Sequence, residues 1–161
     1  MRSLILSFAL TLAVLISGCQ TPHSFATPDA SWKSHVGQLK FSDRKRTVIG
    51  EVVVQQRGPA EFQLDFLKGG GIALMSVRED ADKARVEGLL ARGSWQGSPA
   101  TAPKPHRPWL TLREAFLQQK PTMSGSNHPW QSRGTYSGGE LSGLSVAFPE
   151  DNQRFEFQFS R

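Results

Sequence analysis

Short stretches of alternating apolar and polar residues, separated by only a few turn residues, constrain the fold of this 161-residue chain more than any other feature. In the stretch 47–56, Val48, Gly50, Val52 and Val54 fall on one side of a predicted strand. Similar alternation recurs over 39–41, 62–66, 72–77 and 84–88. Parallel strands need crossover connections of about a dozen residues or more, and the turns here are too short for that. The sequence therefore predicts an antiparallel meander.

Two further strands are predicted near the C-terminus, at 144–148 and 155–159. Phe155, Phe157 and Phe159 share one face of the last strand. Three aligned phenylalanines carry a large apolar surface. The pattern is compatible both with a filled core and with a cavity that receives an apolar ligand.

The segment between these two groups of strands, at about 93–131, differs in character. It begins as a proline-rich loop over 93–108, and Thr111 and Glu114 then fit a helical capping box. The predicted helix starts at Thr111 and ends before Pro121. Its apolar stripe consists of Leu112, Ala115 and Phe116. A helix this short is not stable alone, so we expect it to pack across the sheet.

The N-terminus has the pattern of an export signal. Arg2 supplies a positive charge, and residues 4–16 are apolar apart from two polar positions. This length suits a signal-peptide core and is too short for a permanent membrane span. The signal ends in Ile-Ser-Gly-Cys at 16–19, which resembles a bacterial lipobox. The resemblance implies that Cys19 is lipidated and that residues 1–18 are removed. The alternative is an ordinary secretory signal followed by a chance cysteine.

Lipidation would attach the protein to a membrane, since each buried methylene contributes about 0.8 kcal/mol. Gln20, not aspartate, follows the cysteine. The sorting rule that accompanies the lipobox then favours the bacterial outer membrane, on its periplasmic side. Residues 19–35 are predicted to be the lipidated cysteine and a flexible tether, whose polar part has an extended reach on the order of 40 Å. Residues 36–161 are predicted to form one antiparallel β domain.

The chain has a formal net charge of +5, and its densest basic cluster lies at 44–46, between two predicted strands. Such a cluster is either a solvated turn or a contact for anionic lipid head groups, near which each basic residue gains about 1 kcal/mol. Export makes a nucleic-acid partner implausible despite the positive charge.

The whole arrangement resembles the LolA/LolB fold, an incomplete antiparallel barrel closed by helices. The local matches are Phe62 to Leu74, which reads as a strand, a glycine loop and a second strand, and the closing hairpin from Phe148 to Phe159. The resemblance implies a mainly β protein with a curved sheet and one short helix packed across it. It also implies an acyl-binding interior, for which the candidate lining residues are Val52, Leu64, Leu74 and Phe157.

In this fold a protruding loop carries an apolar residue that assists insertion into the membrane. Phe66 and Leu67 occupy the matching place, before the glycines at 69–71. Glycine suits such a tip because it tolerates positive φ. For Leu67 the other interpretation is that it ends a core strand.

These features predict a non-catalytic, membrane-anchored envelope lipoprotein that binds or transfers an acyl chain or a lipoprotein. The alternative is an interaction module that binds an envelope protein and carries no ligand. The histidines have no metal-ligand spacing, and no serine lies in a Gly-x-Ser-x-Gly elbow. No metal, cofactor or catalytic residue is therefore predicted.

Overall fold

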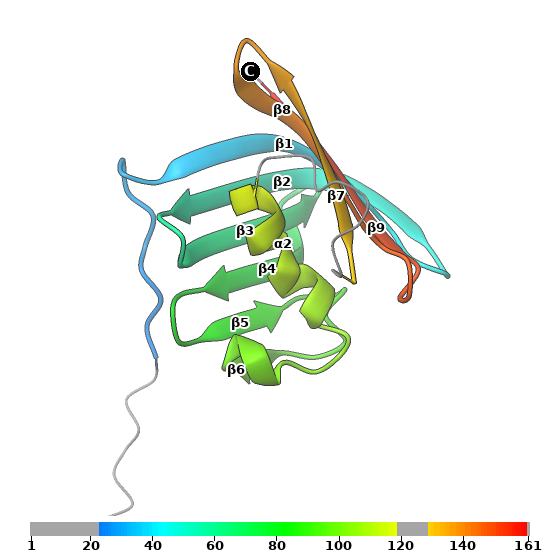
Figure 1. Ribbon diagram of the computed structural model, residues 1–161. Coiled ribbons are helices and arrows are strands. Elements are labelled where there is room, and N and C mark those ends of the chain that lie inside the picture. Colours follow the sequence, from blue (N-terminus) through cyan, green and yellow to red (C-terminus); the bar gives the residue numbers. More distant parts are fainter. Residues whose placement is uncertain (1–22, 119–128, 161) are drawn as a thin grey trace, which may run out of the picture.

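The computed structural model describes residues 23–118 and 129–160. Nine antiparallel strands form one open sheet in the order β6-β5-β4-β3-β2-β1-β9-β8-β7 (Figure 1). The strands are β1 (Lys33–Ser42), β2 (Thr47–Arg57), β3 (Glu61–Lys68), β4 (Ile72–Glu79), β5 (Ala84–Glu87), β6 (Trp95–Gly97), β7 (Gln131–Ser137), β8 (Glu140–Phe148) and β9 (Gln153–Phe159). A 3-10 turn, η1 (Pro99–Thr101), precedes helix α2 (Arg107–Gln118). The prediction of a mainly β fold, with a curved antiparallel sheet crossed by one helix, is confirmed for the described residues.

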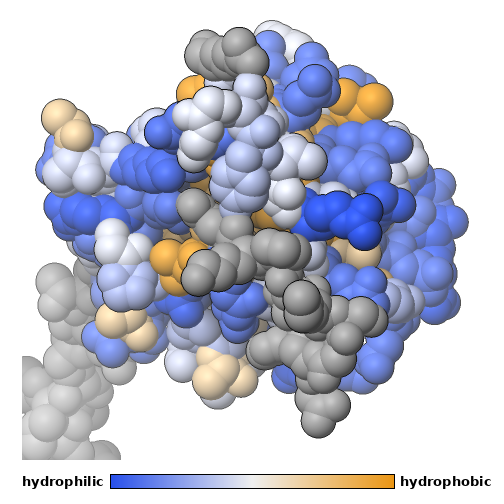
Figure 2. Space-filling model, turned by 45° about the horizontal axis from the view of Figure 1, so that its top comes forward, coloured by the Kyte–Doolittle hydropathy of each residue, from blue (hydrophilic) through white to orange (hydrophobic). Residues whose placement is uncertain are grey.

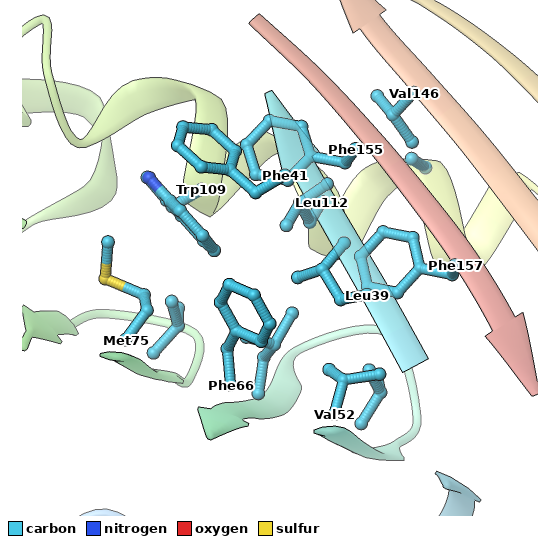
Figure 3. Close-up of a cluster of buried hydrophobic side chains, with 14 of the residues drawn as sticks. Leu39, Phe41, Val52, Phe66, Met75, Trp109, Leu112, Val146, Phe155 and Phe157 are labelled. Atoms are coloured by element: carbon cyan, nitrogen blue, oxygen red, sulfur yellow. The ribbon is translucent and has the colours of Figure 1, made fainter. Parts of the chain in front are cut away.

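The core lies between the concave face of the sheet and helix α2. Strand register places Leu39 opposite Phe157 and Phe41 opposite Phe155, so these side chains share one face. Trp109 is 2% exposed and belongs to the same buried cluster. Figure 3 shows this helix residue pointing into the interior beside the sheet residues. Because both the sheet and the helix contribute large apolar side chains, the inside of the curve is packed.

Two glycines allow neighbouring strands to approach closely. A Cβ atom at Gly37 would lie 2.0 Å from the carbonyl oxygen of Gln158, and one at Gly50 would lie 2.1 Å from that of Leu67. Any other residue at these positions would push the strands apart. The glycines therefore permit the strong coiling of the sheet around the helix.

Replacing Gly37 by alanine is expected to lower the free energy of unfolding by about 2 kcal/mol, because the new methyl group overlaps a backbone atom that cannot rotate away. The measurement is urea unfolding followed by circular dichroism. Gly69→Ala is the matched control, since no atom lies within 4 Å of its Cβ position. Equal stability of the two variants would contradict the close approach of β1 and β9.

The sequence prediction of the helix start is wrong. Helix α2 begins at Arg107 and not at Thr111, whose hydroxyl donates to the carbonyl oxygen of Arg107 at 2.9 Å. Thr111 thus lies within the helix and does not cap it. Pro108 occupies the first turn, where its missing N–H costs no helical hydrogen bond. Strand β6 was likewise not expected in the predicted loop.

The prediction of a free tether is wrong for residues 23–35. Strand β1 already begins at Lys33, and the segment before it lies along one end of the sheet (Figure 1). The side-chain amide of Gln63 donates to the carbonyl oxygen of Ala26 at 2.6 Å. Trp32 is buried, with 7% exposure. These contacts attach the segment to the domain.

Candidate functional site

The four residues predicted to line an acyl cavity lie together, but in the packed core. Val52 and Leu64 are fully buried, Leu74 is 6% exposed and Phe157 is 5% exposed. All four belong to one buried cluster with Trp109 and other residues of helix α2. Side chains of helix α2 therefore fill the space next to these four residues.

The predicted membrane-contacting loop requires a correction. Phe66 is fully buried and packs in the core, so it does not face a membrane. Leu67, whose partner on β4 is Ala73, is half-buried beside an irregularity in the strand register. The large apolar side chain exposed at this tip is Ile72, at 56%. The alternation of apolar residues in this strand correctly predicts that Phe66 faces the core. The prediction of membrane contact came only from the family resemblance.

A different site lies at the end of the sheet where the β1–β2 and β8–β9 turns come together. The turns face the loop after β5 and the loop before α2, and the four segments enclose a hollow of about 320 Å³. Its apolar walls come from Phe41, Leu90 and Trp109. We call this hollow the end pocket. Its volume is at the lower end of the range for small-molecule sites, roughly 300–1,000 Å³.

The rim of the end pocket carries more positive than negative side chains. The basic residues are Arg44, Lys45, Arg46, Arg92 and Lys104, and the acidic residues are Asp43, Glu150 and Asp151. Asp43 is already engaged, because its carboxylate accepts from the backbone N–H groups of Lys45 at 2.8 Å and Arg46 at 3.0 Å. This turn fixes the basic cluster at the pocket.

Several of these cations are free to receive a ligand. Lys45, Arg92 and Lys104 form no ion pair with any residue in the described ranges 23–118 and 129–160. Arg92 has φ of 54°, an uncommon conformation for a residue other than glycine. The Arg44 guanidinium lies 2.9–3.0 Å from the side-chain amide of Asn152, with the amide oxygen turned toward it. The rim therefore presents unpaired donors above an apolar floor.

A buried ion pair joins helix α2 to the end of the sheet opposite the end pocket, where Arg113 also donates to the carbonyl oxygen of Ala60. Arg113 Nη1 lies 3.1 Å from Glu79 Oε1, and the Glu79 side chain is 2% exposed. Burial raises the pKa of Glu79 to about 7, against the opposing effect of the Arg113 charge. The other carboxylate oxygen has no hydrogen-bond partner among the described residues. This pair holds the helix in place and is not part of the end pocket.

Two histidines, His35 and His106, are buried. Burial lowers the pKa of His35, whose ring lies 5.0 Å from that of Phe159, and also that of His106. Neither ring has a charged partner within an ion-pair distance in the described part. The described residues contain no group of three or more potential metal ligands. These histidines are packing residues of the core.

Sequence reasoning identified part of the end pocket. The cluster at 44–46 is visible in the sequence, but Arg92, Lys104 and Trp109 come from other loops and from the helix. Nothing in their local patterns links them to the cluster. Cys19 lies outside the described residues. None of the helices in the described part combines the length and apolar character required to cross a membrane.

The fold and the site together define a mainly β protein, in which an open antiparallel sheet is crossed by a helix and bears a basic pocket at one end. In comparisons with known proteins, the chain matches no protein-family model and no curated protein. The resemblance to LolA/LolB and the lipid anchor at Cys19 remain predictions from the sequence.

Proposed function

We propose that this protein is a lipid-anchored, non-catalytic protein of the bacterial envelope that binds an acylated ligand with an anionic head group, in a manner similar to LolB. The anchor is Cys19, and the location that its sequence favours is the periplasmic side of the outer membrane. The single observation that supports the ligand class is the end pocket, where unpaired cations stand above an apolar floor.

The two parts of the end pocket suit the two parts of such a ligand. Phosphate or carboxylate oxygens accept charge-assisted hydrogen bonds from Arg44, Arg92 and Lys104, which are stronger than neutral ones. Methylene groups against Phe41 and Trp109 contribute about 0.8 kcal/mol each when buried. Because the core behind the floor is filled, the pocket matches the head group and the first part of a chain rather than a complete acyl chain.

A single-chain anionic phospholipid is expected to bind more tightly than a zwitterionic one of equal chain length. The measurement is a titration below the micellar concentration, with the mature chain from Gln20 onward, which retains the whole described sheet and core. Combined Arg44→Gln and Lys104→Gln substitution is expected to weaken binding of the anionic lipid about tenfold, a change of about 1.4 kcal/mol. Binding of the zwitterionic lipid should stay unchanged.

Lys68→Gln is the control, because it removes an exposed positive charge at the same end of the sheet but outside the end pocket. It should leave both affinities unaltered. Equal affinities of the unaltered protein for the two lipids would refute recognition of the head group by the pocket. Equal losses of anionic-lipid affinity in the double variant and in Lys68→Gln would refute it as well.

The filled core favours a second candidate function, the binding of an envelope protein that carries no acyl ligand. In this case the basic rim would contact an acidic surface of the partner. The distinguishing result is a discrete protein adduct from a photo-reactive group at Lys45 in living cells, together with no uptake of either lipid by the purified protein.

A further inference from the structure

The N-terminal segment, residues 23–32, is held at one end of the sheet by several independent contacts. His23 Nε2 lies 2.5 Å from Asp80 Oδ2 in the β4–β5 turn. Asp29 Oδ2 lies 3.8 Å from Nη1 of Arg57, at the end of β2. Together with the hydrogen bond to Gln63, these contacts span three strands. We call this end of the molecule, with the turns at 58–60 and 80–83, the anchor end.

Trp32, the last residue of the N-terminal segment, adds a further contact with the sheet. Its ring lies under the guanidinium of Arg57, with 5.3 Å between the Cζ atom and the ring centroid. Arg57 is in turn bound to Glu61, with Nη2 2.7 Å from Oε1. Cation–π contacts of this kind contribute about 0.5–1 kcal/mol at exposed sites. The segment is therefore attached by packing as well as by polar contacts.

The attachment leaves little chain between the lipid and the folded domain. Only residues 20–22 separate Cys19 from His23. The four steps from Cys19 to His23 span at most about 14 Å at roughly 3.5 Å per residue. The eleven residues of β2 alone extend about 35 Å at 3.3 Å per residue. The lipid can therefore lie near the anchor end but not near the end pocket.

From this geometry we infer that the anchor end is the surface that faces the membrane, and that the end pocket opens into the aqueous compartment. The inference depends on the proposed lipidation of Cys19. It identifies the phospholipid surface as the partner of the anchor end. It also means that the basic cluster at 44–46 acts on ligands that arrive from water and not on the head groups of the anchoring membrane.

Ion pairs at the anchor end are compatible with this orientation. At the anchor end Glu61 and Asp29 lie beside Arg57, whose positive charge partly neutralises these two carboxylates before they approach anionic lipid. Apart from the grey residues, the face in Figure 2 is mainly hydrophilic and its apolar patches are small and separate.

Single introduced cysteines test the orientation in the full-length lipidated protein, reconstituted in vesicles of phosphatidylethanolamine and phosphatidylglycerol. Ala81→Cys places a fluorophore at the anchor end, and Lys68→Cys places one at the opposite end of the sheet. The side chains of Ala81 and Lys68 are both exposed. Cys19 is the only native cysteine, and its thiol does not react with the fluorophore when it carries lipid. A quencher in the head-group region is expected to reduce the Ala81 signal at least threefold more than the Lys68 signal.

A linker insertion provides the control. Twelve Gly/Ser residues placed between Gln20 and Thr21 lengthen the reach by about 40 Å at full extension while leaving residues 23–32 intact. The difference between the two sites should then largely disappear. His23→Ala combined with Gln63→Ala should reduce it partially, because two contacts of the segment are lost.

Equal quenching at the two sites in the unaltered protein, or stronger quenching at Lys68, would overturn the proposed orientation. Failure of the protein to remain with the vesicles would overturn the anchoring on which it rests. Neither result bears on lipid binding by the end pocket, which is measured without a membrane. Failure of the orientation and failure of the proposed function are thus distinguishable.

Discussion

Replacing Phe116 by alanine is expected to reduce the free energy of unfolding by about 3–5 kcal/mol. Phe116 is fully buried on helix α2, and its ring centroid lies 5.2 Å from that of Phe157 and 5.9 Å from those of Phe62 and Phe159. The substitution leaves a cavity among rings that belong to both halves of the sheet. Such a loss is a large part of the 5–15 kcal/mol that stabilises a typical domain.

Urea unfolding at fixed pH measures this effect, with Leu117→Ala as the matched control. Leu117 is the next residue on the same helix and is 40% exposed, so its removal should cost less than about 1 kcal/mol. A loss for Phe116→Ala as small as that for Leu117→Ala would mean that the helix is not an integral part of the core.

The second large effect concerns Glu79. The pKa of Glu79 is raised by burial to about 7 in the folded protein, against an ordinary value of 4.5. Between these values the folded protein binds more protons than the unfolded chain, so stability falls as the pH rises through the folded pKa. The stabilisation by the protonated carboxyl is complete below pH 4.5, and its loss amounts to about 3 kcal/mol by pH 8.

Glu79→Gln mimics the protonated carboxyl and should remove this loss. The variant and the unaltered protein are expected to be similarly stable at pH 5, whereas the variant should be more stable at pH 8 by up to about 3 kcal/mol. The measurement is urea unfolding of both proteins at the two pH values. An unchanged difference between the proteins at pH 5 and pH 8 would show that Glu79 titrates normally.

The comparison with the Glu79→Gln variant is necessary because the buried histidines change stability with pH in the direction opposite to Glu79. Burial lowers the pKa values of His35 and His106 in the folded protein. Their contribution to the free energy of unfolding is therefore fully present above pH 6.5 and is lost as the pH falls. They are identical in the two proteins, and their effect cancels in the difference. The same applies to Glu156, whose pKa the hydrogen bond from Lys40 lowers.

The strands could be predicted where side-chain alternation is strong, and less well elsewhere. Val52 and Val54 on β2, and Phe155 and Phe157 on β9, point inward as their spacing predicts. Strand β6 has only three residues, which is too few for a period to be recognised. The helix start was misplaced because Thr111 and Glu114 resemble a cap, while the actual first turn contains Pro108.

The end pocket could be predicted only in part, for a physical reason. Local sequence patterns report which face of an element is buried, because burial follows the period of that element. They do not report which loops meet in space. Lys104 and Arg92 approach the β1–β2 turn only because the meander returns to the same end of the sheet and the helix begins there.

The position of β9 has a consequence for when folding can be completed. In the sheet β9 lies between β1 and β8, so the first strand of the domain pairs directly with the last. This pairing has a very large sequence separation, and contacts of this kind slow folding because a long loop must close first. Within the described sheet, β7 and β8 are connected to the other strands by hydrogen bonds through β9. The sheet is thus completed only when β9 has formed, and until then β1 keeps one edge open.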